Sequence, residues 1–426
     1  MSDHKRIYLC LAHMSGKEQA FIQEAFDTNW VVPLGPNVNG FEKDLEVFCG
    51  QNKRVVALSS GTAAVHLALI ACGVGPGDEV LVQSFTFCAS SHPITYLGAT
   101  PVFIDSEKDT WNMDPALLEE AIEDRIAKTG KKPKAIVPVA LYGMPYRIDR
   151  IMAIANRYEI PVVEDAAEGF GSRYNGQVLG TFGKYGVLSF NGNKMITTSG
   201  GGALITPDED AWREIMMYAT QYRESYPYYQ HEKIGYNYRM SNICAGIGRG
   251  QMTVADEHIA HHKRLQVLYK QLLADVPGIV VHDNPEMPGQ AGHDAPGRYD
   301  SNFWLITITL DPSIRIKGKE NAYKTIVKGA VGGAAGVIHA ADSAITDCQP
   351  NDNVEALRVY MDAAGIEARP VWKPMHKQPV YKNAPAYLNG VSESIFKVGM
   401  CLPAGPCVTD EDVQYIVDTI KDAIVH

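Results

Sequence analysis

The feature that most constrains the fold is an alternation of short β-branched runs with amphipathic stretches along the first two thirds of the chain. Amphipathic stretches with apolar residues at helical spacing occupy residues 62–72, 114–124 and 148–158. Strands and helices in this rhythm form a mostly parallel sheet covered by helices, so we predict an α/β fold. The predicted strands are residues 55–58, 79–82, 101–104, 135–139, 161–163, 187–190 and 203–206.

A proline- and glycine-rich stretch after residue 276 divides the chain into two parts. A long helical pattern over residues 240–273 precedes the proline- and glycine-rich residues 277–298, which we interpret as a linker or surface loop. We therefore predict a large domain over residues 1–275 and a smaller α+β domain over residues 276–426. Within the second domain, residues 317–350 are rich in Gly and Ala without a fixed repeat. Its other expected elements are strands at 302–310 and 367–371 and helices at 353–364 and 410–425.

Charge and hydropathy exclude several classes of protein. The 426 residues include 39 Lys plus Arg and 49 Asp plus Glu, a net charge of −10, which disfavours nonspecific nucleic-acid binding. Two charge-free stretches, 55–77 and 80–104, contain Ser, Thr, His and Gln side chains that a membrane-spanning helix would have to desolvate. Near the start, His13 and Lys17 interrupt an apolar run too short for a secretion signal. We expect a cytoplasmic protein with no membrane association.

Eight cysteines are scattered along the chain, without a C-x-x-C pair and without histidines at zinc-ligand spacing. This distribution is typical of reduced, mostly buried thiols in a reducing compartment. We therefore expect neither disulfides nor a metal site.

A Ser-Ser-Gly-Thr motif at residues 59–62 follows a predicted strand and begins a predicted helix. Free backbone N–H groups and the helix dipole at such a position can hold a phosphate. The same residues could instead form a simple helix cap.

The strand-like run at residues 162–163 leads into Glu164 and Asp165, with Glu168 close behind. Ligand sites of open α/β sheets lie at the carboxyl ends of the strands, where Asp165 could hold a protonated ring nitrogen. The alternative is that Asp165 caps the following turn.

Lys194 is the only charged residue between Tyr185 and Pro207, in a glycine-rich turn between two predicted strands. A desolvated lysine amine is suited to Schiff-base chemistry. The alternative is an ordinary solvent-exposed lysine.

A polar and aromatic loop at residues 235–241 precedes the long helical pattern and contains Asn237 and Arg239. These side chains could bind a phosphate or a sugar, or they could simply belong to a loop that begins a helix.

Taken in order, these segments resemble the DegT/DnrJ/EryC1/StrS aminotransferases, which act on sugars and have the fold-type I architecture of pyridoxal 5′-phosphate (PLP) enzymes. The resemblance extends from about residue 21 to the C-terminus. It implies a large domain with a mostly parallel seven-stranded sheet and a smaller C-terminal domain. Its further matches are Pro-Leu-Gly-Pro at 33–36, Thr-Phe at 86–87, Tyr-Leu-Gly-Ala at 96–99 and Glu-Asp-Ala-Ala at 164–167.

The resemblance implies a role for individual residues. Lys194 would form the Schiff base with PLP, and Asp165 would pair with the pyridine nitrogen. Phe87 matches the aromatic residue that stacks on the ring, and Asn237 a residue that reaches the cofactor phosphate of the neighbouring subunit, which implies a homodimer with shared active sites. The residues expected at the cofactor phosphate are Ser60, Gly61, Thr62 and Ser189.

Three further residues are placed near the substrate by the resemblance. Glu168 occupies a position beside the cofactor, and Arg239 and His376 match segments that face the nucleotide sugar in relatives. Residues 317–350 depart from the compact family pattern and are expected to form an inserted lid or surface subdomain.

The resemblance is strongest to enzymes that aminate the 4-keto carbon of UDP-linked 6-deoxy-N-acetylhexosamines for bacterial surface polysaccharides. The expected donor is an amino acid, L-glutamate, and Lys194 would be both covalent anchor and general acid/base. Alternatives are a 3-keto-sugar aminotransferase of the same family and a non-catalytic sugar-nucleotide-binding or regulatory protein. Lys194 argues against the family's dehydratases, which have histidine there. The absence of a G-x-G-x-x-G motif after the first strand argues against an NAD-dependent oxidoreductase.

Overall fold

A computed structural model describes residues 5–50, 52–285, 298–319 and 348–425. Its largest element is a sheet whose strands follow the spatial order β3-β2-β4-β5-β8-β9-β1, with two isolated parallel bridges joining β4 to β5. All neighbours are parallel except β9, which is antiparallel to both β8 and β1. The strands are β1 (Arg54–Leu58), β2 (Glu79–Gln83), β3 (Thr100–Ile104), β4 (Ala135–Val137), β5 (Val163–Asp165), β8 (Tyr185–Ser189) and β9 (Gly202–Thr206).

This sheet confirms the predicted α/β fold of type I with seven mostly parallel strands. The C-terminal region adds a short eighth strand, β14 (Ala386–Tyr387), parallel to β3.

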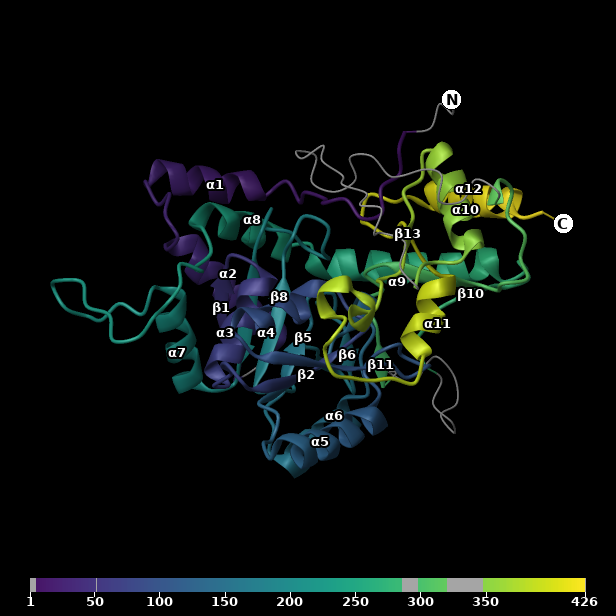
Figure 1. Cartoon of the computed structure of the whole chain (residues 1–426). Helices are drawn as coiled ribbons and strands as arrows, with labels where there is room; N and C mark the ends of the chain where they lie inside the picture. Colours follow the sequence, from purple (N-terminus) through teal and green to yellow (C-terminus); the bar gives the residue numbers. More distant parts are fainter. Residues whose placement is uncertain (1–4, 51, 286–297, 320–347, 426) are drawn as a thin grey trace.

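Helices cover both faces of the large sheet, as the continuous apolar strands require. In β1, Val55 and Ala57 belong to one core cluster, whereas Val56 and Leu58 belong to the other. The first cluster is completed by α2 (Pro36–Cys49), α5 (Pro115–Thr129) and α6 (Ile148–Tyr158), and the second by α3 (Gly61–Ala71), α4 (His92–Tyr96) and α7 (Glu209–Ala219). Figure 1 shows the sheet strands between these helices, with α5 and α6 at the bottom.

A second, antiparallel sheet has the order β10-β12-β15-β13. Its strands are β10 (Ile279–Val281), β12 (Ile306–Leu310), β13 (Arg369–Pro370) and β15 (Gly399–Leu402). Residues of α9 (Ala255–Leu273), α10 (Asp352–Ala363) and α12 (Asp410–Ala423) form a separate core with this sheet. Helix α11 (Val391–Val398) contributes instead to the core of the large sheet. The proposed domain division at residues 275 and 276 stays a prediction, because α9 contributes to both cores.

The long helical pattern over residues 240–273 is two helices, α8 (Asn242–Met252) and α9. The break falls at Thr253, whose hydroxyl donates to the Gly250 carbonyl 2.7 Å away, and at Val254, whose φ of −126° is not helical. Side chains that bond to the preceding turn often bend helices in this way.

Three other expectations are corrected by the structure or fall partly outside the described residues. The predicted linker at 277–298 contains β10, and its residues 286–297 lie outside the described residues. The predicted strand at 302–310 is a strand only from Ile306 onward. Of the Gly/Ala-rich segment 317–350, residues 320–347 lie outside the described residues, so the expected lid or subdomain stays a prediction.

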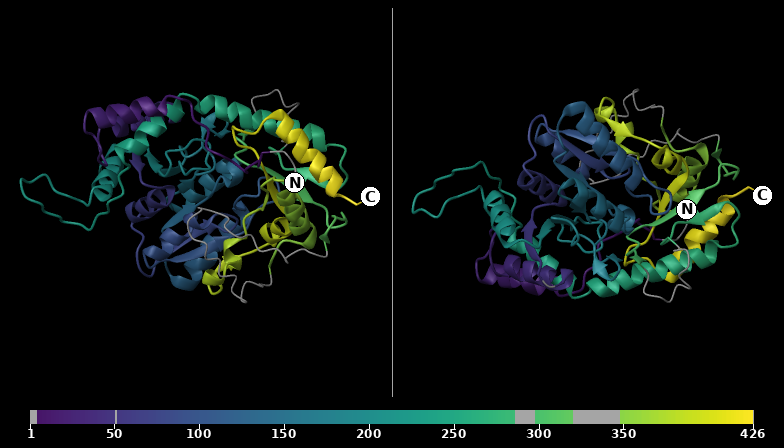
Figure 2. Two further views of the ribbon diagram at one scale, coloured as in Figure 1. Left: turned by 90° about the horizontal axis from the view of Figure 1, so that it is seen from above. Right: turned by 90° about the horizontal axis from the view of Figure 1, so that it is seen from below.

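The remaining described elements are short or peripheral. Between α7 and α8 the chain leaves the body of the molecule as a long projection, seen in teal in Figure 1 and in both views of Figure 2. The other elements are α1 (Glu18–Asp27), β6 (Arg173–Tyr174), β7 (Gln177–Val178), β11 (Tyr299–Asp300) and the single-turn helices η1 (Cys88–Ser90), η2 (Leu141–Gly143), η5 (Met375–Lys377) and η6 (Pro379–Tyr381).

Cys10, Cys49, Cys348 and Cys401 are buried, and Cys407 is exposed. Within the described ranges, no helix has the length and apolar character needed to cross a membrane.

Candidate active site

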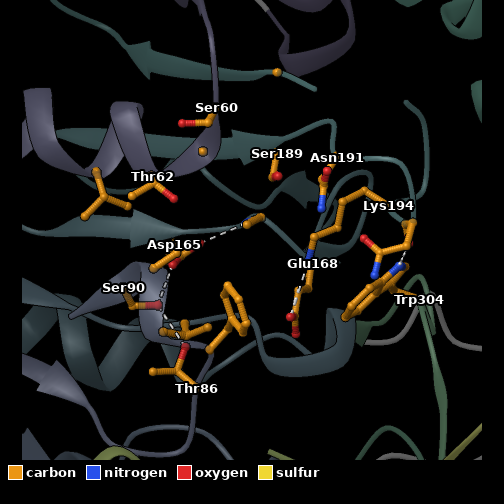
Figure 3. A pocket seen from close by; sticks show the side chains of 18 of the residues that line it. Ser60, Thr62, Thr86, Ser90, Asp165, Glu168, Ser189, Asn191, Lys194 and Trp304 are labelled. Carbon is orange, nitrogen blue, oxygen red and sulfur yellow. Dashed lines mark hydrogen bonds and ion pairs between the residues drawn. The ribbon is translucent and has the colours of Figure 1, made fainter. Parts of the chain in front are cut away.

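The carboxyl ends of β1, β5 and β8 lie at one edge of the large sheet, next to the start of β9. Open α/β sheets place their ligand sites at this edge. A cavity of about 440 Å³ lies there, and Figure 3 shows its lining side chains. The predicted site residues that line it are Ser60, Gly61, Thr62, Phe87, Asp165, Glu168, Ser189 and Lys194.

The N-terminus of α3 forms one wall of this cavity. Ser60 is the N-cap, and its hydroxyl accepts a hydrogen bond from the Ala63 N–H at 3.0 Å. The capping interpretation is therefore correct for Ser60, and it leaves the first-turn amides of Gly61 and Thr62 for an anion.

Missing side chains keep this wall open. A Cβ at Gly202 would lie 2.3 Å from the Gly61 nitrogen, and a Cβ at Gly61 would lie 3.1 Å from the Cβ of Ser189. The glycines thus allow β8, β9 and α3 to converge into a cradle next to the Ser189 hydroxyl.

Asp165 ends β5 and is buried at the base of the cavity. The Ser90 hydroxyl donates to Oδ2 at 2.6 Å and the Ala167 N–H to Oδ1 at 3.1 Å, while Ser90 is itself bonded to Thr86. Burial raises the pKa of Asp165 above its usual range, and the Ser90 hydrogen bond opposes this effect. A cationic partner inside the cavity would favour the ionised form.

The preceding carboxylate serves another purpose. Glu164 is buried and accepts backbone N–H bonds from Gly180 at 3.1 Å, Phe182 at 2.5 Å and Gly183 at 2.6 Å. It therefore fixes the loop that precedes β8 and does not line the cavity.

Lys194 extends into the cavity, with its side chain only 14% exposed. Its Nζ lies 3.4 Å from Glu168 Oε1, as Figure 3 shows, and 3.8 Å from the centre of the Trp304 ring. The other oxygen of Glu168 accepts the Tyr142 N–H at 2.7 Å. Burial raises the pKa of Glu168, and the charge of Lys194 opposes this effect.

Aromatic residues complete the lining. Phe87 is half exposed, and its ring centre lies 5.3 Å from that of Trp372. The indole N–H of Trp304 donates to the Asn193 carbonyl at 2.7 Å. Sequence reasoning missed Trp304, because an aromatic residue inside a predicted strand is ordinarily part of a core. The only sequence signal near Trp372 was His376, which lies four positions further along the chain.

Three predicted residues lie elsewhere within the described part of the chain. The Arg239 guanidinium pairs with Glu42 and donates to the Ala57 carbonyl at 3.0 Å, and Asn237 and Arg239 line a neighbouring cavity of about 460 Å³. The buried His376 ring is hydrogen-bonded through Nδ1 to Ser84 Oγ at 2.7 Å. Arg239 and His376 are not among the residues that line this chain's own cavity, and their assignment to the substrate stays a prediction.

PLP requires an amine that can bond to its aldehyde, a carboxylate for its ring nitrogen and an anion cradle for its phosphate. The cavity provides Lys194, Asp165 and the N-terminus of α3. The residues therefore fit this cofactor, and the fold and the site together define a PLP-dependent transferase of fold type I.

The chain belongs to the DegT/DnrJ/EryC1/StrS aminotransferase family, whose sequence model matches residues 13–317 and 322–421. It is 42% identical over 421 residues to the "Putative pyridoxal phosphate-dependent aminotransferase EpsN" of Bacillus subtilis, covering 98% of this chain and 95% of the relative. It is 34% identical over 425 residues to GDP-perosamine synthase of Caulobacter vibrioides, covering 100% of each chain.

Among solved structures, the crystal structure of a DegT/DnrJ/EryC1/StrS aminotransferase from Brucella abortus matches with a TM-score of 0.78 and 27% identity, over 96% of this chain and 95% of that one. The protein is an aminotransferase, and PLP is its cofactor.

Proposed function

We propose that this aminotransferase moves the amino group of L-glutamate to the 4-keto carbon of a UDP-linked 6-deoxy-N-acetylhexosamine. The product would be a UDP-4-amino sugar for a bacterial capsule, glycan or lipopolysaccharide. The observation that carries the proposal is the meeting of Lys194 and Asp165 in one cavity. The full-length likeness to GDP-perosamine synthase supports a nucleotide sugar as the acceptor, and it makes the nucleotide the first variable to test.

The proposed residue roles follow from the geometry. PLP, when bound, supplies an electron sink for the pair left behind when a proton leaves the substrate carbon. Asp165 would hold the ring nitrogen in its protonated form, which in turn favours the ionised carboxylate. The amides of Gly61 and Thr62, with the hydroxyl of Ser189, would hold the phosphate at the positive end of α3.

Lys194 would hold the cofactor covalently and, once displaced by the amino donor, act as general base and acid. Its amine would accept the proton from the donor carbon in the first half of the reaction. In the second half it would return a proton to the former keto carbon of the sugar. Glu168, 3.4 Å away, lies where it can stabilise the protonated amine.

A homodimer with shared active sites is part of the proposal. The cavity that contains Asn237 shares Ser59 and Gly200 with the main cavity, so Asn237 lies next to the cofactor site without lining it. The projection between α7 and α8 exposes large apolar side chains, including Tyr229 and Ile234. Both features are those of a surface completed by a second copy of the chain.

Absorbance spectroscopy tests the reaction. Wild-type protein with PLP should show a band from the lysine linkage, which glutamate bleaches and UDP-4-keto-6-deoxy-GlcNAc restores, whereas Lys194→Ala should show no such band. Identical spectra of wild type and variant would remove Lys194 from the proposed mechanism.

A panel of acceptors then tests the substrate. Recovery by a GDP-linked 4-keto sugar or by a UDP-linked 3-keto sugar, but not by the UDP-4-keto sugar, would overturn the proposed acceptor while keeping transamination. NMR of the product determines the configuration at C4.

A mixing experiment tests the shared site. Asn237→Asp and Lys194→Ala chains should each be inactive alone. If Asn237 acts on the partner's cofactor, mixed dimers contain one intact site and regain activity. Activity in either variant alone, or no activity in the mixture of the two, would contradict shared sites.

A further inference from the structure

The amine of Lys194 has two close neighbours, a carboxylate and an aromatic ring, and the proposed reaction gives no role to the ring. On one side is Glu168 Oε1 at 3.4 Å, and on the other is the face of the Trp304 ring, whose centre lies 3.8 Å from Nζ. Figure 3 shows the end of the lysine chain next to Glu168, with Trp304 beside the lysine. Trp304 is almost completely buried, and it comes from the segment that enters the second sheet.

One short segment fixes both sides of this arrangement. The Asn302 amide donates to the Glu168 and Phe170 carbonyls, each at 2.9 Å, and its oxygen accepts the Trp304 N–H at 2.8 Å. The indole N–H of Trp304 binds the carbonyl of Asn193, the residue before Lys194. Residues 302–304 therefore connect the backbone of Glu168 to the backbone that carries the lysine.

The local backbone is specialised for this contact. Phe303 has a φ of +50°, which is uncommon for a bulky residue. A Cβ at Gly143 would lie 1.8 Å from the Asn302 side-chain oxygen, so only glycine leaves room for Asn302. Strained conformations of this kind persist where the surrounding structure requires them.

A carboxylate and the face of a tryptophan ring are groups that bind an ammonium ion. Tryptophan gives the strongest cation–π attraction of the aromatic residues, and the attraction grows when the cation is desolvated. The other titratable groups facing the amine are Asp165, Glu168 and Cys10. Because burial raises the pKa of Cys10 to about 12, this thiol is neutral near pH 7 and supplies no charge.

We propose that the Trp304 ring and the Glu168 carboxylate form a resting site for the protonated amine of Lys194 whenever this amine is not bonded to the cofactor. The proposal rests on the role of Lys194 proposed above. Trp304 is then a positioning residue that keeps the displaced amine beside the cavity.

The test measures the rate at which apo-enzyme captures PLP, followed by absorbance as a function of pH. Trp304→Leu removes the ring and should move the pH midpoint of capture down by about one unit, because the ammonium form loses its cation–π partner. Trp304→Phe also lacks the indole N–H but retains a ring face, so its midpoint should lie between those of wild type and Trp304→Leu. The comparison of Phe with Leu thus isolates the ring face from the Asn193 hydrogen bond.

Trp212→Phe is the matched control. Its indole N–H also binds a carbonyl, that of Val55 at 3.1 Å, and the Arg54 guanidinium carbon lies 4.2 Å from the centre of its ring. It is not part of the cavity lining, so its substitution should leave the midpoint unchanged.

An unchanged midpoint in folded Trp304→Leu would overturn the proposal. If Trp304→Leu fails to fold in thermal denaturation, Trp304→Met, which also lacks a ring, takes its place, and an unchanged midpoint in that variant would overturn the proposal. Borohydride reduction of the wild-type protein with PLP, followed by peptide mass spectrometry, tests the proposed function separately. A PLP adduct on a residue other than Lys194 would reject the proposed function, whereas an adduct on Lys194 with an unchanged midpoint would reject only the resting site.

Discussion

At the scale of single residues, the cavity contains two buried carboxyl groups with different partners. Asp165 receives a hydroxyl and an amide hydrogen bond, whereas Glu168 receives one amide hydrogen bond and lies beside the amine. Burial raises the pKa of both, so each needs a cation to ionise fully. In the proposed mechanism the cofactor ring would supply a positive charge for Asp165, whereas Lys194 lies 3.4 Å from Glu168 and can supply one there.

Asp165→Asn should lower kcat/KM by about 100- to 1000-fold, because an amide cannot keep the ring nitrogen protonated as a carboxylate does. The lysine linkage should still form, so the absorbance band should persist while turnover is lost. Steady-state kinetics with a coupled assay of glutamate consumption checks this. An active Asp165→Asn protein would exclude the assigned role.

Glu168→Gln should change how the stability of the apo-protein depends on pH. A carboxyl whose pKa is raised in the folded state stabilises the protein below its ordinary value of 4.5 and loses this contribution as pH rises through the folded value. Gln does not ionise, so the free energy of unfolding of the variant relative to wild type should rise between pH 4 and 8, by about 1.4 kcal/mol per unit of pKa elevation.

Urea unfolding at several pH values measures this difference, with the exposed Glu232→Gln as control. A difference that stays constant over this range would show that Lys194 fully offsets the effect of burial.

Some residues of the site could be predicted from the sequence and others could not. Lys194 and Asp165 could be proposed from sequence because each stands out locally, one as the single charge in a long neutral stretch and the other at a strand end. Trp304 and Ser90 gave no such signal, because their importance depends on contacts with residues more than 70 positions away. Arg239 and His376 matched the family segments, but their polar atoms are bonded to other parts of the chain.

At the scale of elements, the phosphate cradle depends on how closely β8, β9 and α3 approach one another. Two glycines, Gly61 and Gly202, set this distance, since a side chain on either would meet the opposite element. The cradle is therefore a property of backbone packing more than of individual polar side chains.

Gly202→Ala should push the N-terminus of α3 away from β9, because the new Cβ would lie 2.3 Å from the Gly61 nitrogen. We expect a loss of about 1–3 kcal/mol of stability and weaker PLP binding. Thermal denaturation and a PLP titration followed by fluorescence check both effects.

Gly75→Ala is the matched control, since a Cβ there meets no atom within 4 Å. Equal PLP affinity of the two variants would contradict the role of Gly202 in shaping the phosphate cradle.

Elements with a regular burial pattern were predicted closely. Helix α6 has its expected bounds, and most strand ends agree to within two residues, because the apolar residues that form the core also define the periodicity. The pattern failed where side-chain chemistry interrupts it. Thr253 breaks the long helix, and residues 302–305 are as apolar as a strand but leave the sheet to reach the cavity.

At the scale of the whole molecule, large apolar side chains are exposed on the projection between α7 and α8. Ile234 is 84% exposed and Tyr229 78%, both on the projection between α7 and α8. Exposed apolar groups gathered on one extended segment are expected to be covered in the assembled protein.

The double substitution Tyr229→Ser and Ile234→Ser should weaken the proposed dimer by at least about 100-fold, because burying each side chain is worth about 1.5–3 kcal/mol. Analytical ultracentrifugation measures the dissociation constant. Val280→Ser, at an exposed position on β10, serves as the control. Unaltered association of the double variant would place the dimer interface elsewhere.

Helix α9 belongs to both halves of the structure: Ala255 and Ile259 pack in the core of the large sheet, and Leu265, Tyr269 and Leu273 in that of the small one. Neither half can melt without removing part of the other's core, so heating should produce one cooperative calorimetric transition. Leu357→Ala, which empties space only in the small core, should lower the temperature of this single transition, since such truncations cost about 2–5 kcal/mol. Two separate transitions, with only one shifted, would show that the halves unfold independently. Phe303 packs in the small core and the next residue, Trp304, lies beside Lys194, so a substitution that loosens the small core should also disturb the contact between Trp304 and the lysine.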